Sequence, residues 1–244
     1  MKTEMIERVR KKTSCMKAIV FDIGQTLTYY PIPLNWSNLY RPAFESVAKK
    51  LGIHFTQKDY IHFGEVLTKY NTRITPREKE YSSTTIFTEM IANTSVDPSF
   101  MQDIKREFYS FFRVDTRIYP EAEEALKRIK DMGIRTATLS DVPYGMDNEY
   151  ALGDLGSLIK YIDLPFTSND TGYRKPCKEG LIMIASEFGV NPSEMAFVGD
   201  EVKDVVCAHN AGTKAVLINR TGGKKDFGQD IEIENLNELI AYLQ

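Results

Sequence analysis

Five polar residues, each next to a short apolar run, could together act on a phosphoryl group. Asp22 directly follows one such run, and Ser140 ends another. Lys175 lies in a Gly-Tyr-Arg-Lys-Pro segment, while Asp200 and Asp204 share the segment Gly-Asp-Glu-Val-Lys-Asp. A carboxylate can attack phosphorus as a nucleophile only where the repulsion between the two anions is neutralised. The residue types therefore suggest a nucleophile surrounded by charge-neutralising partners.

Each of these residues has a chemical role that fits its type. Mg²⁺ takes hard oxygen ligands, commonly one or two carboxylates with waters and the phosphate itself. Asp22, Asp200 and Asp204 could supply the carboxylates, with Asp22 acting as both ligand and nucleophile. Lys175 would counter the charge on the attacking carboxylate and the phosphoryl oxygens. The Ser140 hydroxyl, with nearby backbone N–H groups, would hold the remaining oxygens.

The elements that must position these residues have an alternating α/β pattern. Helical stretches separate the apolar runs, which is typical of a parallel, doubly wound sheet in a Rossmann-like domain. The carboxyl ends of parallel strands lie along one edge, where ligands bind. The expected strands cover residues 17–21, 134–139, 164–167, 195–198, 214–218 and 231–233.

Residues 31–116 have a different pattern, with apolar side chains at helical spacing. Leu39, Ala43 and Val47 predict one helix that stops at Gly52. Asp97-Pro98 is typical of a helix start. We expect four helices here, the second, third and fourth marked by Ile61 to Tyr70, Ile86 to Ile91 and Met101 to Phe111. The predicted organisation is a Rossmann-like core from 16–30 and 117–244, an inserted all-helical domain at 31–116, and an N-terminal extension at 1–15.

Composition narrows the class of protein. The net charge is −3, from 31 basic and 34 acidic residues, so the chain has no overall field that would attract nucleic acid or an anionic membrane. No apolar run approaches the ~20 residues that cross a bilayer. The 3 cysteines have no Cys-x-x-Cys spacing, which indicates thiols in a reducing cytoplasm. The segment 1–15 is polar and basic and lacks the apolar region of a secretory signal.

The polar segments around Asp22, Ser140, Lys175 and Asp200, taken in their order along the chain, resemble the motifs of the haloacid dehalogenase-like hydrolase superfamily. The resemblance is to a member with a helical cap after the first motif. The motifs correspond to Asp22 through Leu27, then Ser140, then Lys175, and then Asp200 with Asp204. The resemblance extends over nearly all of 16–244, although the insert matches only by position, length and helical character. It implies a five-stranded parallel core, a mobile cap and, in the family's phosphatases, an aspartyl-phosphate intermediate.

The resemblance also implies roles for the turn after Asp22. Gly24 and Thr26 would help to bind the phosphate together with Ser140 and Lys175, and the Gly24 carbonyl would bind the metal. The family's phosphatases have a second aspartate at this position, two residues after the nucleophile, and it acts as general acid and base. Gly24 cannot do so, and such catalysis is typically worth about 10²–10⁴-fold.

Three explanations for the missing acid remain open from the sequence. The enzyme could be slow, its leaving group could need no proton, or another acid could serve. Asp141, Glu201 or a residue of the cap could substitute, although we interpret Asp141 as a turn residue.

The sequence favours a cytoplasmic, Mg²⁺-dependent phosphatase of small phosphorylated metabolites. One alternative is a degenerate member of the fold that binds a phosphorylated ligand or a protein partner. Another is a metal-independent dehalogenase, although the pair Asp200 and Asp204 would then have no metal to hold. A phosphonate-cleaving enzyme would need a cap lysine, for which Lys49 and Lys50 are unconvincing. Neither substrate identity nor oligomeric state can be predicted from the sequence.

Overall fold

The computed structural model describes residues 16–32, 35–113 and 115–243. These residues form two compact units. The core unit contains the described residues up to Tyr29, then Ile118–Asp141, and those from Leu155 onward. The helical unit contains Tyr30–Arg117 and Val142–Asp154. The expected N-terminal extension, 1–15, lies outside the described residues.

The core unit is built on a six-stranded parallel sheet, which confirms the Rossmann-like α/β fold. The sheet has one strand more than the five that the resemblance implied. Strands are added on one side of β1 as far as β5, and the chain then returns to the other side of β1 to add β6, β7 and β8. In order across the sheet, the strands are β5 (Leu164–Thr167), β4 (Arg135–Ser140), β1 (Ala18–Phe21), β6 (Met195–Gly199), β7 (Lys214–Ile218) and β8 (Ile231–Ile233).

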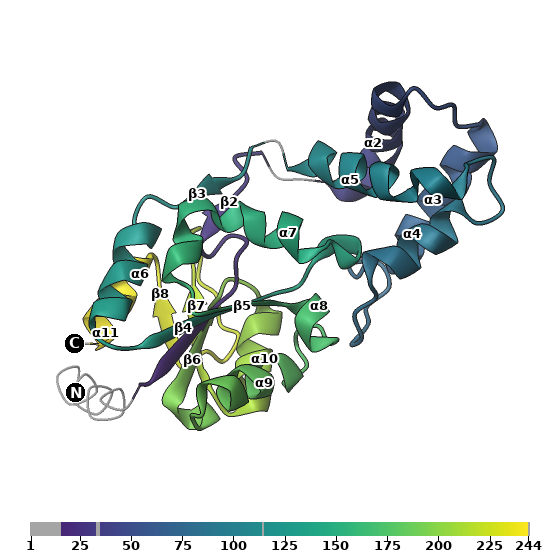
Figure 1. The fold of residues 1–244 in the computed structure, drawn as a ribbon. Coiled ribbons are helices and arrows are strands. Elements are labelled where there is room, and N and C mark those ends of the chain that lie inside the picture. The colour runs from purple at the N-terminus through teal and green to yellow at the C-terminus, as the bar shows by residue number, and fades with distance from the viewer. Residues whose placement is uncertain (1–15, 33–34, 114, 244) are drawn as a thin grey trace. The chain divides into compact units, whose positions relative to one another are not determined.

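Helices cover both faces of this sheet (Figure 1). Successive side chains of a strand point to opposite faces, so β1 is apolar along its whole length. Ala18 and Val20 pack in the cluster formed with α9 (Glu179–Phe188) and α10 (Val202–Ala211). The opposite face is covered by α6 (Ala122–Asp131) and α11 (Leu236–Leu243). Asp22, which directly follows β1, therefore lies at the carboxyl end of a fully buried central strand.

Four α-helices form most of the helical unit, as the sequence predicts for the insert. The left-handed Gly52, with φ 64°, ends the first helix, and Asp97 accepts a hydrogen bond from the Ser99 N–H where the chain enters the fourth. Ile61, which we expected in a buried stripe, is 52% exposed. The helices are α2 (Trp36–Leu51), α3 (Gln57–Tyr70), α4 (Ser83–Ile91) and, after the 3₁₀ turn η1 (Pro98–Phe100), α5 (Met101–Phe112).

The expected division between core and insert is wrong for residues 142–154, which belong to the helical unit. The Tyr144 hydroxyl contacts the Tyr40 hydroxyl, and the Tyr109 hydroxyl donates to the Tyr144 carbonyl at 2.9 Å. Lys105 pairs with Asp147 at 2.7 Å. The sequence around Tyr144 resembles an ordinary loop because its partners lie far away along the chain. Its burial is decided by contacts that local periodicity cannot encode.

The remaining elements are short. The helix expected before β5 is a 3₁₀ segment, η3 (Leu152–Tyr161), interrupted at Gly156 with φ 49°. A small two-stranded sheet pairs β2 (Thr28–Tyr29) with β3 (Arg117–Ile118). The others are η2 (Pro143–Gly145), α7 (Asn148–Ala151), α8 (Ser168–Thr171) and η4 (Pro192–Glu194).

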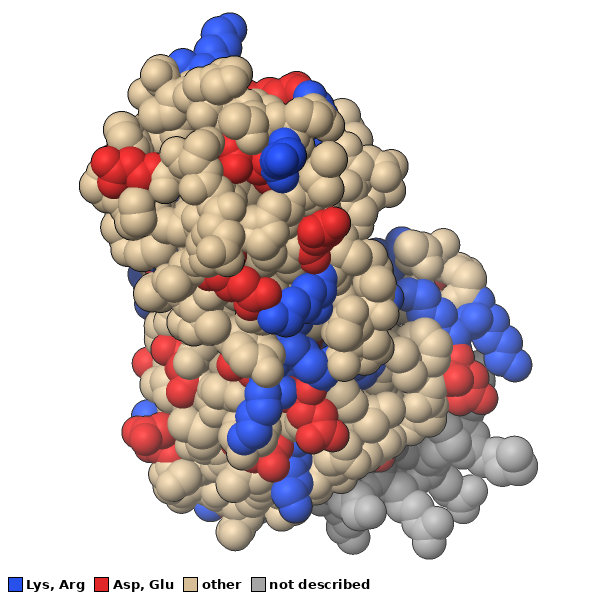
Figure 2. All heavy atoms as spheres, turned by 90° about the vertical axis from the view of Figure 1, so that its right-hand side faces the viewer, with Lys and Arg blue, Asp and Glu red and all other residues tan. Residues whose placement is uncertain are grey.

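The surface and the helix lengths bear on possible partners. On the face drawn in Figure 2, lysine and arginine side chains lie beside aspartate and glutamate side chains. None of the described helices combines the length and the apolar character that crossing a membrane requires.

Candidate active site

Asp22 lies where the strand order reverses, between β1 and β6. Its backbone N–H donates to the Val198 carbonyl at 2.9 Å, and Phe21 is in register with Val198. Asp22 therefore comes beside Asp200, which directly follows β6. In open α/β sheets, ligands bind at this reversal point, outside the carboxyl ends of the strands. One carboxylate oxygen from each of Asp22, Asp200 and Asp204 lies within 4.8 Å of the others.

Asp204 reaches this group from the first turn of α10. Its Oδ2 accepts the Glu201 N–H at 2.9 Å, so the side chain also caps the helix. Gly199 makes the close approach possible, because a Cβ at that position would lie 2.4 Å from Cγ of Asp204. Asp204 thus caps the start of the helix and also belongs to the carboxylate group.

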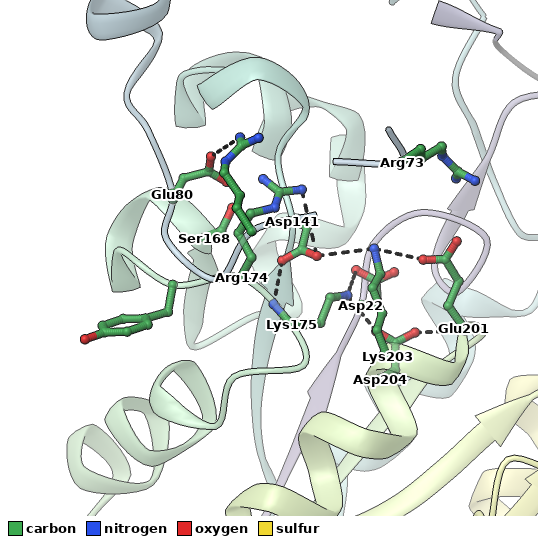
Figure 3. A network of polar contacts seen from close by, with 12 residues as sticks. Asp22, Arg73, Glu80, Asp141, Ser168, Arg174, Lys175, Glu201, Lys203 and Asp204 are labelled. Carbon is green, nitrogen blue, oxygen red and sulfur yellow. Dashed lines mark hydrogen bonds and ion pairs between the residues drawn. The ribbon is translucent and has the colours of Figure 1, made fainter. Parts of the chain in front are cut away.

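Lys175 joins two of the three carboxylates (Figure 3). Its Nζ lies 2.9 Å from Oδ1 of Asp22 and 2.7 Å from Oδ1 of Asp204, and its side chain is only 1% exposed. Burial lowers the pKa of this ammonium, but Asp204 and Asp22 raise it, and the net pKa lies well above the usual value. Lys175 therefore favours its charged form, in contact with Asp22.

The carboxylates themselves lie in a region that disfavours negative charge. Burial is the main cause that raises the pKa of Asp22, against the opposing effect of Lys175. Burial also raises the pKa of Asp200 to about 7, helped by the neighbouring charges of Asp22 and Asp204. Such shifts are typical of sites where charges are held together for chemistry or for a bound cation.

The structure adds residues that our sequence reasoning missed. We interpreted Asp141 as a turn residue, yet its side chain is largely buried. Its Oδ1 accepts a hydrogen bond from the backbone N–H of Lys175 at 3.0 Å. Oδ2 of Asp141 lies 3.2 Å from Nζ of Lys203 and 3.9 Å from Nη2 of Arg174. Lys203 also pairs with Glu201 at 2.8 Å. The signal was present in the dense charges of 200–204 and in the position of Asp141 directly after a strand end.

Asp141 is held as an anion by these cations. Burial raises the pKa of Asp141, but the charges of Lys175, Arg174 and Lys203 together lower it by more, so the net pKa lies below the ordinary value. A carboxyl group with a lowered pKa is a poor proton donor at neutral pH. This argues against Asp141 as the substitute for the missing acid.

The other predicted residues lie at the same edge of the sheet. Ser140 is the last residue of β4, the other neighbour of β1, and is partly exposed. Gly24 forms a bridge with Thr28 in the turn after Asp22. Thr26 is completely buried, and its hydroxyl makes no hydrogen bond with any residue that the structure describes. The contributions of these three residues to phosphate binding stay predictions.

The charge balance of the site suits a divalent cation. The carboxylates of Asp22, Asp200 and Asp204 all offer oxygen, the donor atom that Mg²⁺ prefers. Burial of three neighbouring carboxylates raises the pKa of Asp22 and Asp200, and a divalent cation bound between them would offset this cost.

Comparisons with known proteins agree with this arrangement. The family model for haloacid dehalogenase-like hydrolases matches residues 16–212. The chain is 32% identical over 136 residues to a phosphoserine phosphatase of Thermus thermophilus, a match that covers 54% of each protein, so it spans about half the length of that relative. It is 24% identical over 206 residues to a ribulose-1,5-bisphosphate 5-phosphatase of Halopiger xanaduensis, which covers 83% of this chain and 84% of the relative.

Solved structures share the fold. A HAD phosphatase from Thermococcus onnurineus has a TM-score of 0.63 and 23% identity, covering 93% of this chain and 98% of that one. A 2-haloacid dehalogenase from Pseudomonas syringae has a TM-score of 0.64 and 19% identity, with the same coverage. Because the family model covers more than half of the sequence and the expected motif residues meet at one sheet edge, the chain belongs to the haloacid dehalogenase-like hydrolases.

Proposed function

We propose that this hydrolase is a Mg²⁺-dependent phosphatase of small phosphate monoesters, acting through a phosphorylated Asp22. One observation carries the proposal. The ammonium of Lys175 touches both Asp22 and Asp204, and Asp200 completes the carboxylate group at the reversal point of the sheet. A nucleophilic carboxylate needs such a neighbouring cation, because its target is itself an anion.

The proposed reaction has two displacements at phosphorus. In the first, an Asp22 carboxylate oxygen forms a bond to phosphorus while the ester P–O bond breaks, and the alkoxide leaving group takes a proton from water. In the second, water attacks the phosphorus of the aspartyl phosphate. The bond between phosphorus and the Asp22 oxygen then breaks, which regenerates the carboxylate. The attacking water gives up a proton to the hydroxide that the first step produced, and inorganic phosphate leaves with the water oxygen.

Residues of the core unit would divide the supporting work. Lys175 would neutralise the attacking carboxylate and the phosphoryl oxygens, and the Ser140 hydroxyl would donate to one of these oxygens. Asp22, Asp200, Asp204 and the Gly24 carbonyl would hold Mg²⁺. The ion would supply further positive charge at the phosphoryl oxygens. The close grouping of the Asp22, Asp200 and Asp204 carboxylates supports this part of the proposal.

The lack of an acid at position 24 shapes the expected substrate preference. Gly24 has no proton to give, and the lowered pKa of Asp141 makes that residue a weak donor. Unless Glu201 or a residue of the cap supplies the proton, the leaving group departs unassisted or with a proton from water. We therefore expect slow turnover of alkyl phosphates and faster turnover of esters whose leaving groups are already stable as anions.

Substrate class is inferred from the relatives. The matched proteins act, by their names, on phosphoserine, ribulose-1,5-bisphosphate and phosphoglycolate. All three are small phosphate esters with further polar or charged groups. We propose the same class for this chain.

A panel assay tests the proposal. Purified protein is incubated with small phosphate monoesters, with Mg²⁺ or with EDTA, and released phosphate is measured. We expect Mg²⁺-dependent release that Asp22→Asn abolishes. The matched control is Asp131→Asn, at a carboxylate whose side chain is 64% exposed and which pairs with Lys127 of the same helix. Release that persists unchanged in Asp22→Asn would falsify the mechanism.

Two other outcomes would support the alternatives instead. A phosphorylated compound could raise the melting temperature without being hydrolysed, which would indicate a binding protein. Halide release from 2-haloacids in EDTA would indicate a dehalogenase. The clustering of Asp200 and Asp204 with Asp22 makes us favour the phosphatase, because a metal-independent reaction gives this group of carboxylates no metal ion to bind.

A further inference from the structure

Arg220 lies outside the expected motifs, yet it contacts the turn that follows Asp22. It comes two residues after β7, at the same edge of the sheet as the candidate site. Its Nη2 donates to the Thr26 carbonyl at 2.9 Å. Asn219, next to it, is anchored through its own N–H, which donates to the Ile233 carbonyl at 2.7 Å.

Two further contacts fix the orientation of this guanidinium. Its Nη1 pairs with Oε1 of Glu121 at 2.7 Å, and both side chains are only 16% exposed. Its Cζ lies 3.4 Å from the centre of the Tyr119 ring. A planar guanidinium can stack on a ring while different nitrogens bind different acceptors, which the single nitrogen of a lysine cannot do.

Tyr119 also contacts this turn directly, through two hydrogen bonds. Its hydroxyl donates to Oε1 of Gln25 at 3.2 Å, and its backbone N–H donates to the Leu27 carbonyl at 3.1 Å. Arg220 and Tyr119 together hold the successive carbonyls of Thr26 and Leu27, as well as the side chain between Gly24 and Thr26. The turn is thus tied to the core unit at three adjacent residues.

The turn needs such support because its backbone is unfavourable at one residue. Gln25 has a φ of 55°, in the left-handed region that non-glycine residues rarely adopt. Conformations of this kind persist only where the surroundings enforce them, and they are found at functional sites. Here the strained residue follows Gly24, whose carbonyl is a proposed metal ligand.

We propose that Arg220 is a positioning residue that, with Tyr119, holds the turn Ile23–Leu27 in the shape that presents Asp22 and the Gly24 carbonyl to the metal and the phosphate. The contacts of Arg220 and Tyr119 with the turn support its ordering. The effect of this ordering on metal and substrate binding rests on the proposed function. Replacing a residue that orients a metal ligand without itself binding the metal typically lowers metal affinity or activity by about 10–100-fold.

Hydrogen exchange tests the ordering without any assay of activity. The reporters are the N–H groups of Leu27 and Thr28, which both donate to the Ile23 carbonyl inside the turn. In Arg220→Met we expect faster exchange of these amides, while amides of β6 and β7 keep their wild-type rates. The matched control is Arg135→Met, at an exposed arginine that also stacks on an aromatic ring, with its Cζ 4.3 Å from the centre of Phe188, at the opposite end of β4 from Ser140.

Mg²⁺ titration by calorimetry and steady-state kinetics measure the consequence. We expect Arg220→Met and Arg220→Lys to weaken Mg²⁺ binding and to lower kcat by about 10–100-fold, with a smaller change in KM. Unchanged exchange in the turn, or equally faster exchange throughout the core unit, would overturn the positioning role. If wild-type protein hydrolyses no phosphate ester, the proposed function fails, but the exchange result still decides the role of Arg220.

Tyr119→Phe serves as the second variant if Arg220→Met does not fold. It removes only the hydroxyl that reaches Gln25 and keeps the ring that stacks on Arg220. We expect faster exchange in the turn at an unchanged melting temperature. Exchange rates equal to those of the wild type would contradict the proposal.

Discussion

The ammonium of Lys175 lies 2.9 Å from Oδ1 of Asp22, in a position where the lysine side chain is 1% exposed. The same ammonium lies 2.7 Å from Asp204, so a single buried cation holds two carboxylates together. This relationship links the stability of the site to its chemistry, because removing the lysine leaves both carboxylates buried without this cation.

Lys175→Met should therefore affect both activity and stability. We expect kcat to fall by about 10²-fold or more, since a donor aimed at developing charge is lost. Breaking a buried ion pair from one side typically costs about 3–5 kcal/mol, so the melting temperature should fall as well. Mg²⁺ should restore part of the lost stability by balancing the unpaired carboxylates of Asp22 and Asp204. Thermal unfolding with and without Mg²⁺ measures this, with the exposed Lys127→Met as control.

Gly24→Asp should increase the rate. Nothing lies within 4 Å of a Cβ built at Gly24, and its φ is not in the left-handed region, so the backbone accepts a side chain. An acid in this place should raise kcat for alkyl phosphates by up to about 10²–10⁴-fold.

Two comparisons separate acid catalysis from other effects of this variant. Gly24→Ala occupies the same space without a carboxyl group and should give no gain. With p-nitrophenyl phosphate, whose leaving group needs no proton, Gly24→Asp should bring little improvement. An equal gain from Gly24→Ala, or an equal gain with both kinds of ester, would contradict a missing acid.

Removal of metal should abolish turnover and reduce stability. Ligands that bind only the folded state stabilise it by about 2.7 kcal/mol at a concentration of 100 Kd. We expect saturating Mg²⁺ to raise the melting temperature of the wild type, and Asp200→Asn to remove most of this rise. Differential scanning fluorimetry across a Mg²⁺ series measures it, with Asp131→Asn as the matched variant. A rise that is the same in Asp200→Asn as in wild type would argue against this ligand set.

Asp59 should make the helical unit sensitive to acid. It is 4% exposed at the start of α3, where its Oδ2 accepts hydrogen bonds from the Thr56 N–H at 2.8 Å and the Ser95 hydroxyl at 2.6 Å. Burial alone would raise its pKa, but these hydrogen bonds outweigh burial, and the net pKa lies below the usual value. A lowered pKa in the folded state contributes stability above the unfolded pKa of about 3.9, and this contribution is lost as pH falls through the folded value.

Asp59→Ala should accordingly destabilise the protein at pH 7 by about 1–2 kcal/mol, as expected for a lost cap. The difference from wild type should shrink below pH 4, where the wild-type carboxylate becomes protonated. Urea unfolding at a series of pH values measures both effects. Asp103→Ala, at a 44% exposed aspartate that pairs with Arg106, should change stability much less. A destabilisation by Asp59→Ala that is independent of pH would contradict the role of the ionised carboxylate.

Local sequence predicted the elements well where a strong periodic pattern coincides with a clear stop. The six strands and the four helices of the insert follow from runs of apolar residues bounded by glycine, proline or a capping residue. It failed for residues 142–154, because the burial of Tyr144 depends on Tyr40 and Tyr109, which lie in another part of the chain. It also failed for Asp141, because a strand-end aspartate looks the same whether it faces solvent or three cations.

The sequence by itself determined the sheet, the order of its motifs and the residue types at the strand ends, since these depend on the alternation and spacing of neighbouring residues. Only the tertiary structure decided which charges touch. Lys175 meets Asp22 and Asp204 across strands that are remote in sequence, and Gly199 matters because it leaves room for Asp204. Arg220, about 190 residues from the turn that it holds, has no local pattern to mark it. Contacts of this kind arise from how the chain folds back on itself, and short-range patterns cannot specify them.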